Sequence, residues 1–338
     1  MGTMFGNSLH FLLFMLLFSP VAISELCNPH DKKVLLQIKK DLNNPYLLAS
    51  WDPKTDCCEW YCLKCDPKTH RVYDLFLQTD TDLSGPIPPS VGDLPYLESL
   101  EFHKLPKLTG PMQPAIAKLT KLKYLLITST GISGPIPDFL AQLKNLELLH
   151  LSFNNLSGTI PPSLSQLPNL LSLHLDRNSL TGPIPDSFGS FTKPGPDLIL
   201  SHNQLSGPIP ASLGQLDPDR IDFSRNKLEG DASFLFGRNK KTQILDLSRN
   251  LFSFDFSKVG FPKKSLIWLD LNHNKIHGSI PAGLTTVENL QQFNVSYNQL
   301  CGKIPQGGEL GRFDKYSYLH NKCLCDPPLP NCKLIDAI

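Results

Sequence analysis

Long apolar runs are missing from this 338-residue chain. The most apolar segment, FLLFMLLF at residues 11–18, has eight residues, whereas a membrane-spanning helix needs about 20. Lys, Arg, Asp and Glu are absent from the first 24 residues, which end in Ala22-Ile23-Ser24. A short apolar segment followed by small residues is typical of a secretory signal peptide. We therefore expect residues 1–24 to be a signal peptide and the exported protein to have no membrane anchor.

Excess charge and the common catalytic motifs are also absent. The chain has 32 basic and 31 acidic side chains, so it has no overall field that would attract nucleic acid or an anionic membrane. It contains no phosphate-binding loop, no HExxH and no GxSxG. We therefore expect a protein that is not an enzyme, needs no cofactor or metal, and binds neither nucleic acid nor membrane.

Cysteine is absent from the whole middle of the chain, between Cys65 and Cys301. Nine cysteines occur, all near the two ends, and one must stay unpaired because the number is odd. Their positions are Cys27, Cys57, Cys58, Cys62 and Cys65, then Cys301, Cys323, Cys325 and Cys332. Disulfides in two short terminal caps fit an exported protein. The Cys62-x-x-Cys65 spacing could instead suit a zinc or redox pair, but no second pair or neighbouring histidines accompany it.

What fills the middle is a repeated phrase. LSFNNLSGTIP at residues 151–161 recurs with few changes from Leu175, Leu200 and Leu271. The glycine of each phrase, or Phe254 in its place, recurs every 23–25 residues from Gly85 to Gly302. This period with Leu-x-Leu-x-x-Asn-x-Leu is the signature of leucine-rich repeats. We predict an α/β right-handed solenoid of ten repeats (residues 71–306) with a concave parallel sheet, between cysteine caps at 25–70 and 307–338.

Each position of the repeat has a mechanical role. Leucines alternate with polar residues as on a half-buried strand, and an asparagine follows where the chain turns away. The asparagines stand at 154, 178, 203, 226, 250, 274 and 298. We expect the Gly-x-Ile-Pro segments to form turns on the far side. In the leading cap, Asn28 should begin a helix, with Asp31 bonded back to the amide of Asn28. Trp51 and Trp60 should cover the first repeat.

Because the repeated residues serve the fold, we expect the side chains that vary between repeats to carry the function. Those on the concave strands mix charges with exposed aromatic groups, a composition typical of protein recognition. The alternative is a solvated face on which Asp and Arg pair with each other. The candidate partner-binding residues are Lys123, Tyr124, His150, Phe153, His174, Asp176, Arg177, His202, Asp222, Arg225, Gln243, Asp246, Arg249, Trp268, Asp270 and His273.

Longer segments resemble one family. The stretches CNPHDKKVLLQIKKDL (27–42), SWDPKTDCCEWYC (50–62) and NVSYNQLCGKIPQGG (294–308) are similar to polygalacturonase-inhibiting proteins of plant cell walls, and the resemblance extends from about residue 26 to 333. It implies a secreted, non-catalytic glycoprotein whose concave face, Gln243 included, binds endopolygalacturonases of fungi, with insect enzymes as a further target. It also implies the disulfides Cys27–Cys57, Cys58–Cys65, Cys301–Cys323 and Cys325–Cys332, with Cys62 free.

Three further expectations accompany this interpretation. The sequons at Asn155 and Asn294 are glycan sites, with Asn155 favoured because it lies at the turn. Lysines and arginines at the edges could hold a monomeric protein to cell-wall pectin, which is polyanionic. Two rival functions on the same scaffold are ice binding, as in the carrot-type antifreeze protein, and peptide binding as a soluble co-receptor.

Overall fold

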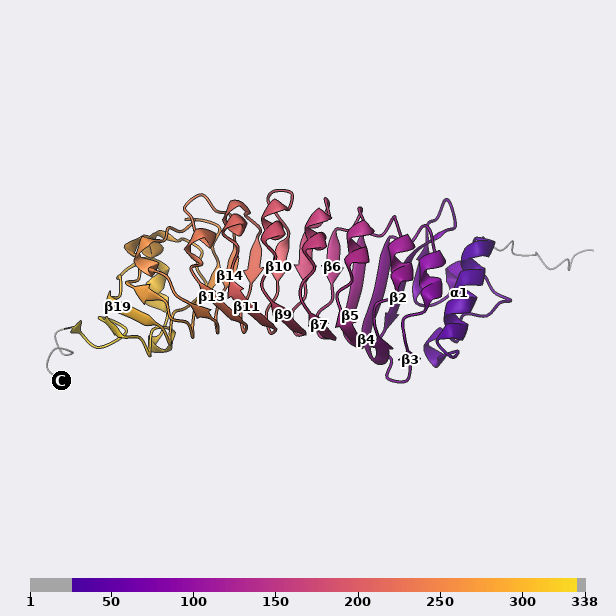
Figure 1. Cartoon of the computed structure of the whole chain (residues 1–338), viewed down its shortest axis with the longest axis horizontal. Helices are drawn as coiled ribbons and strands as arrows, with labels where there is room; N and C mark the ends of the chain where they lie inside the picture. Colours follow the sequence, from indigo (N-terminus) through magenta and orange to yellow (C-terminus); the bar gives the residue numbers. More distant parts are fainter. Residues whose placement is uncertain (1–25, 333–338) are drawn as a thin grey trace, which may run out of the picture.

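A computed structural model describes residues 26–332 of the chain. The expected signal peptide (1–24) and the tail 334–338 lie outside the described residues. The repeats stack into one curved solenoid, with the helix α1 (Pro29–Asp41) at one end and β19 (Gln299–Lys303) near the other (Figure 1). No helix among the described residues has the length and apolarity that crossing a bilayer requires.

One strand from each repeat enters the concave sheet, which confirms the predicted solenoid. Within residues 26–332 its ten parallel strands are β2 (Val72–Gln78), β4 (Ser99–Gly110), β5 (Tyr124–Pro135), β6 (Leu148–His150), β8 (Ser172–His174), β10 (Asp197–Ile199), β12 (Arg220–Asp222), β14 (Ile244–Asp246), β16 (Trp268–Asp270) and β18 (Gln292–Asn294). β1 (Leu63–Cys65) pairs antiparallel with β2 and closes one edge. Equivalent leucines, such as Leu149 and Leu173, lie opposite each other and are fully buried.

A second row of strands, at positions predicted to be turns, follows the asparagine of each repeat. It comprises β3 (Ser84–Gly85), the ends of β4 and β5, β7 (Asn155–Gly158), β9 (Ser179–Gly182), β11 (Gln204–Pro208), β13 (Lys227–Gly230) and β15 (Leu251–Phe252). β17 (His277–Gly278), β19 and β20 (Cys323–Cys325) continue it as a separate sheet. The prediction failed because these strands are short and the Pro of each phrase, which suggested a turn, follows only after the strand has paired.

Short 3-10 helices form the remaining side of each repeat, opposite the second row of strands (Figure 1). Those of five residues are Pro89–Asp93, Pro114–Lys118, Asp138–Gln142, Pro162–Gln166, Asp186–Ser190, Ala211–Gln215, Ala282–Thr286 and Gly308–Arg312. Repeats seven and eight have only three-residue turns, Ser233–Leu235 and Phe256–Lys258. These two repeats also lack the Gly-x-Ile-Pro phrase, so the change in sequence coincides with shorter 3-10 helices.

The asparagines, buried or half-buried, serve the structure at the turn as their regular spacing predicted, and they also link neighbouring repeats. Asn250 is representative: its Nδ2 donates to the carbonyl oxygens of Phe223 (2.9 Å), Leu247 (3.3 Å) and Ser248 (3.2 Å). Its Oδ1 accepts from the backbone N–H of Leu228 (3.0 Å). Each asparagine therefore satisfies backbone groups that the turn leaves without strand partners, and it does so across two repeats.

The terminal caps carry the four disulfides that the family resemblance implied. Cys27 pairs with Cys57, Cys58 with Cys65, Cys301 with Cys323, and Cys325 with Cys332. Cys62 is free and buried. Three of these sulfurs, from Cys27, Cys57 and Cys58, lie near the Asp56 carboxylate, but disulfide sulfurs are not the thiolates that bind zinc.

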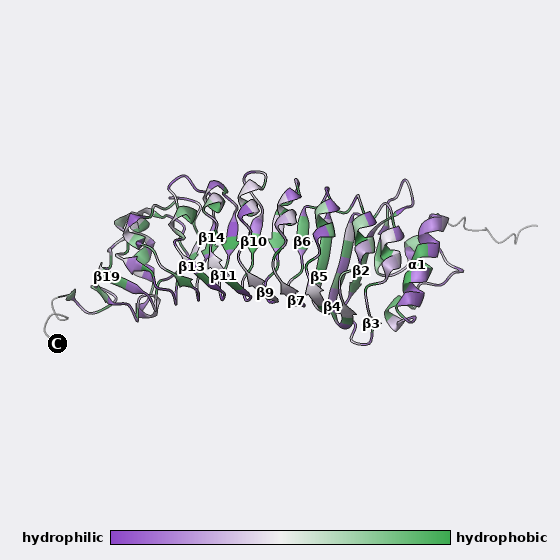
Figure 2. Ribbon diagram, in the orientation of Figure 1, coloured by the Kyte–Doolittle hydropathy of each residue, from purple (hydrophilic) through white to green (hydrophobic). Residues whose placement is uncertain are grey.

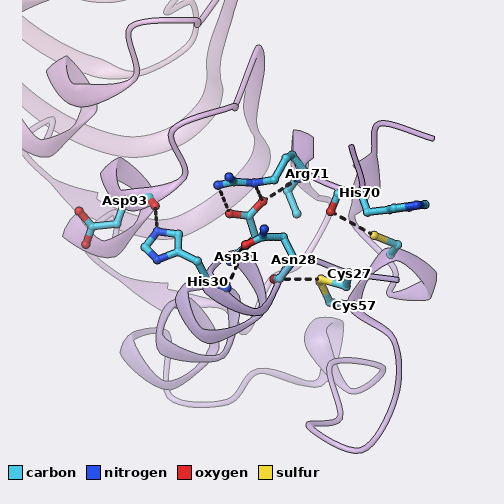
Figure 3. A network of polar contacts seen from close by, with 10 residues as sticks. Cys27, Asn28, His30, Asp31, Cys57, His70, Arg71 and Asp93 are labelled. Carbon is cyan, nitrogen blue, oxygen red and sulfur yellow. Dashed lines mark hydrogen bonds and ion pairs between the residues drawn. A yellow bond between two sulfur atoms is a disulfide. The ribbon is translucent and has the colours of Figure 1, made fainter. Parts of the chain in front are cut away.

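The leading helix begins as predicted in one respect and differently in another (Figure 3). Asn28 caps α1, because its Oδ1 accepts from the amides of His30 and Asp31. The expected bond from Asp31 to the amide of Asn28 is wrong. The buried Asp31 carboxylate instead accepts from Arg71 Nε (2.9 Å) and Nη2 (2.7 Å) and from the amide of Val72 (2.9 Å). It thereby links the cap to the first repeat strand.

Buried apolar residues form one continuous core cluster along the solenoid. Residues of high hydropathy recur along the strands and the 3-10 helices (Figure 2). Trp51 and Trp60 stack with ring centroids 5.6 Å apart and are buried in this core. Their role as a cover for the first repeat stays a prediction. The solenoid is thus continuously packed from cap to cap, which gives the concave side chains a rigid base.

Candidate functional site

Parallel pairing places the variable side chains of the concave face in columns. The first column, in register across β6 to β16, contains His150, His174, Ile199, Asp222, Asp246 and Asp270. The second column follows two residues later and is largely buried; it contains Ser152, Asp176, Ser201, Ser224, Ser248 and Asn272. Only the first and third columns therefore offer much side-chain surface to a partner.

The third column has an unusual backbone that the sequence did not reveal. Phe153, Arg177, His202, Arg225, Arg249 and His273 all have φ between 53° and 58°. Residues other than glycine rarely adopt this left-handed conformation. Here it lets the chain leave the strand while pointing a large side chain away from the core. The same conformation recurs at Tyr297 and His320, which extend the column beyond the residues predicted from sequence.

The acidic part of the first column is held by hydrogen bonds within each strand. Asp222 Oδ1 accepts from Ser224 Oγ (2.7 Å), and Asp246 and Asp270 accept from the amides two residues later, at 3.0 Å each. Burial raises the pKa of Asp246 to about 6, and the neighbouring carboxylates of Asp270 and Asp222 add to this rise. Burial also raises the pKa of Asp270, which is only 9% exposed.

Four arginines lie around this acidic column, and one of them forms an ion pair with it. Within residues 26–332, the ion pair on this part of the face joins Arg220 Nη2 to Asp222 Oδ2 at 3.6 Å. Among residues 26–332, no ion pair joins the exposed Arg177, Arg225 or Arg249 to an acidic side chain. These groups line a shallow polar hollow of about 430 Å³. Arg220 was not among the predicted residues, although its place two residues before Asp222 on one strand face could have revealed it.

Two histidines occupy the next part of the first column. The rings of His150 and His174 lie 4.5 Å apart between centroids. Burial lowers the pKa of His150 to about 4, and the nearby His174 contributes to this effect. Burial lowers the pKa of His174 as well. Both imidazoles are therefore neutral at pH 7 and present a weakly polar surface beside the charged centre.

Exposed aromatic side chains flank the columns. Phe153, Trp268 and Tyr124 are 51%, 39% and 40% exposed, as predicted for anchors of a protein interface. The Arg177 guanidinium lies over the Phe153 ring at 4.9 Å. Tyr124 Oη donates to Glu147 Oε2 at 3.2 Å.

Strand register places further side chains on the concave face that the repeat motif did not predict. Leu171 is 66% exposed and stands at the position that Lys123 and Gln243 occupy in other repeats. Lys123 forms an ion pair with Glu98 at 2.8 Å. Tyr297 stacks between His273 and His320, with 4.1 Å between ring centroids on each side. The sequence contains these Leu, Tyr and His residues, but it does not show that they line up with the columns of the concave face.

The two sequons lie on different faces. Asn155 is exposed at the start of β7, in the second row of strands. Asn294 is half-buried in β18 on the concave face, where its Oδ1 accepts from Ser296 Oγ at 2.7 Å. A glycan at Asn155 would leave the columns open, whereas one at Asn294 would cover their end.

Known proteins share this architecture and much of its sequence. Family models for the leucine rich repeat N-terminal domain match residues 28–66, and leucine rich repeat models match residues 120–180, 197–216 and 265–286. The chain is 66% identical to a polygalacturonase inhibitor of Pyrus communis, over 96% of this chain and 98% of the relative. It is also 66% identical to polygalacturonase inhibitor 1 of Arabidopsis thaliana, over 95% and 98%. The chain belongs to the polygalacturonase inhibitor family.

A solved plant ice-binding protein is similar as well, with 55% identity, a TM-score of 0.88, and coverage of 90% of this chain and 98% of that protein. The backbone alone therefore does not separate inhibition from ice binding. The side chains of the columns, which alternate between Asp, Arg, His and aromatic groups, are what a functional assignment must explain.

Proposed function

We propose that this protein is an extracellular inhibitor of fungal endopolygalacturonases and that it binds the enzyme through its concave face. The observation that carries the proposal is the 66% identity, across nearly the whole chain, to proteins named polygalacturonase inhibitors. We infer that the protein acts as an inhibitor and not as an enzyme, because its concave face is wide and open, whereas catalysis needs a sheltered pocket.

The chemistry of the face supports this mode of binding. Arg177, Arg225 and Arg249 have no ion-pair partner within the described residues and are available to carboxylates of a partner. Asp222 and Asp246 are available to basic groups on the rim of the enzyme's cleft. Phe153 and Trp268 supply exposed apolar area at either end. An ordinary complex buries about 1,600 Å² in total, and a preformed rigid sheet offers its share with little ordering cost.

The site of action follows from the chain's chemistry. Four disulfides in the described residues suit an oxidising, extracellular compartment such as the plant cell wall. We place a glycan at the exposed Asn155 and regard the protein as a monomer. Cell-wall pectin is a second proposed partner.

A reducing-end assay tests the proposal. Several fungal endopolygalacturonases are measured on polygalacturonate with and without the purified protein, and with the variants Arg225→Ala and Trp268→Ala. We expect inhibition by the parent protein and about tenfold or greater weakening in each variant, as for a buried interface anchor. Tyr46→Ala, which changes a 93% exposed tyrosine of the leading cap, is the matched control and should inhibit like the parent.

The outcomes separate the rival functions. Inhibition of no enzyme at micromolar protein would refute the proposal for the enzymes tested. Thermal hysteresis without inhibition would assign the chain to ice binding instead. Retention on plant membranes rather than on fungal enzymes would favour a co-receptor role.

A further inference from the structure

Arg220 lies in the middle of the charged part of the concave face but belongs to none of the three columns. It begins β12, two residues before Asp222, and the residues beside it on the neighbouring strands are Asp197 and Ile244. Its side chain reaches the first column, because Nη2 lies 3.6 Å from Asp222 Oδ2 and Arg220 lines the polar hollow of about 430 Å³. A partner docked on this face would therefore cover Arg220.

The guanidinium of Arg220 makes no hydrogen bond within residues 26–332. Arginine has five N–H donors, and its hydrogen bonds to carboxylates are usually about 2.7–2.9 Å long. The 3.6 Å separation from Asp222 is therefore an ion pair without a hydrogen bond. Among the buried side-chain nitrogens and oxygens of the described residues, only Nε of Arg220 has no partner. A buried donor in this condition lowers the stability of the free protein.

Arg71 shows how the same chain satisfies a guanidinium that serves the fold. Its Nε and Nη2 donate to the two oxygens of Asp31 at 2.9 Å and 2.7 Å, the side-on fork that arginine forms with carboxylates (Figure 3). Arg220 has the same pair of donors, yet no carboxylate of the described chain bonds to them. The comparison indicates that Arg220 is not held for a structural purpose.

The carboxylates nearest to Arg220 are bonded to other donors. Asp222 accepts from Ser201 Oγ at 3.1 Å, and from Oγ and the amide of Ser224 at 2.7 Å and 3.1 Å. Asp197 Oδ1 accepts from the backbone amide of Arg220 at 2.9 Å. These bonds fix both carboxylates, so neither is turned towards the guanidinium. The fold thus keeps a cation in place while leaving its donors uncommitted.

The surroundings suit a carboxylate that comes from another protein. The Arg220 side chain is 44% exposed, so its outer nitrogens are accessible from the hollow. Ile199, which also lines the hollow, is apolar and buried. Burial lowers the pKa of His174, and the charge of Arg220 adds to this effect, so this imidazole does not compete as a cation. Arginines in such central, partly desolvated positions are frequent hot spots of protein interfaces.

We propose that Arg220 is a specificity-determining residue of the inhibitor: it binds an Asp or Glu side chain of the polygalacturonase through Nε and Nη2. The inference rests on the proposed function, because it names one contact by which the enzyme is selected. In the complex the guanidinium turns towards the hollow, and the enzyme's carboxylate accepts from both nitrogens. An enzyme with a neutral or basic group at that place leaves the donors unpaired in a dry interface and is inhibited weakly.

Substitutions at Arg220 test the residue in the reducing-end assay, with an enzyme that the parent inhibits. Arg220→Met keeps the apolar stem and removes the donors, so it should weaken inhibition about tenfold or more. Arg220→Lys keeps the charge but not the fork, and we expect it to recover only a small part of the loss. The matched control, Arg238→Met, changes an exposed arginine outside the concave hollow and should inhibit as the parent does.

Thermal unfolding of the same variants separates recognition from folding. Arg220→Met removes a buried donor that has no partner in the described chain, so its melting temperature should equal or exceed the parent's. A melting temperature well below the parent's, restored together with inhibition by Arg220→Lys, would show that the charge serves the fold. That result would overturn the inference.

A double-mutant cycle identifies the enzyme's carboxylate. Each exposed Asp or Glu around the enzyme's cleft is replaced by Asn or Gln, and the Kd for the parent inhibitor and for Arg220→Met is measured, which does not require an active enzyme. We expect one enzyme variant to bind the parent about tenfold more weakly and to bind Arg220→Met no more weakly than the unchanged enzyme does.

Two outcomes distinguish this inference from the proposed function. Additive losses at every acidic position, or equal inhibition by the parent and Arg220→Met, would overturn the role of Arg220 and leave the proposed function intact. A parent protein that inhibits none of the enzymes would refute the proposed function, and this inference with it.

Discussion

The raised pKa of Asp246 predicts that the substitution Asp246→Asn stabilises the protein in a pH-dependent way. Burial and the facing carboxylates of Asp222 and Asp270 raise this pKa from 3.8 to about 6. The folded protein therefore keeps the proton to a higher pH than the unfolded chain does. The stability that this carboxyl contributes is present below pH 3.8 and is lost as the pH rises through about 6.

The size of the effect follows from the two pKa values. Their difference corresponds to about 3 kcal/mol at pH 7.5, and water at the open concave face reduces this to about 1–2 kcal/mol. Asparagine cannot ionise, yet its Oδ1 can still accept from the Ser248 amide. The variant should therefore match the parent near pH 4 and be more stable by that amount at pH 7.5.

Urea denaturation at a series of pH values, with the disulfides intact, measures this difference. Comparison of variant with parent at each pH removes the contribution of His150, whose lowered pKa acts in the opposite direction by favouring the folded state at higher pH. Asp186→Asn, at an exposed position, is the control and should give no trend. A stability difference that is flat with pH, or largest at pH 4, would refute the reasoning.

Three further predictions concern the scaffold. Asn250→Ala leaves the buried carbonyl of Phe223 and the amide of Leu228 unpaired, so the free energy of unfolding should fall by about 3–5 kcal/mol in urea, whereas Asn155→Ala at the exposed sequon should change it little. Asp31→Ala removes the partner of Arg71 and of the Val72 amide and should cost about 3 kcal/mol; a melting temperature equal to the parent's would contradict the role given to this link. Cys62 is buried and its pKa is raised to about 12, so iodoacetamide at pH 8 should leave it unmodified in the folded protein and label it in urea; rapid labelling without urea would show that the site opens.

Much of the fold was predictable because the repeat constrains it locally. The Leu-x-Leu spacing fixed the buried side of each concave strand, and the asparagine period identified the turn that Asn250 and its equivalents satisfy. The second row of strands was missed because its members, such as Asn155–Gly158, pair only through stacking, which no single repeat can show. Asp31 was misassigned because its partner, Arg71, lies 40 residues away.

The candidate face was predictable as a set of columns but not in its energetics. Trp268 and Phe153 are exposed as their positions suggested. Asp270, by contrast, is nearly buried, and within the described part of the chain the three arginines of the third column form no ion pair with the nearby aspartates. Such properties depend on side-chain packing across strands, and a one-dimensional pattern does not contain them.

The backbone conformation of the third column affects both the stability of the fold and the side chains offered to a partner. Every member, Arg225 included, holds a left-handed conformation that disfavours residues with a Cβ by about 1–2 kcal/mol. Glycine would adopt it freely, yet the column is filled with Arg, His and Phe. Strain kept at a recognition surface is expected where the side chain is needed by a partner and the surrounding stack fixes the backbone.

Two substitutions at Arg225 separate these contributions. Arg225→Gly should relieve the strain and raise the free energy of unfolding by up to about 1 kcal/mol, offset in part by the greater entropy of the unfolded chain, while inhibition of polygalacturonase weakens. Arg225→Lys retains the Cβ and the charge, so it should keep the parent's stability and lose only the guanidinium's geometry. Urea titration and the reducing-end assay on the same samples measure both quantities. If glycine at this position instead lowers stability and leaves inhibition intact, the side chain serves the fold and the third column is not a contact surface.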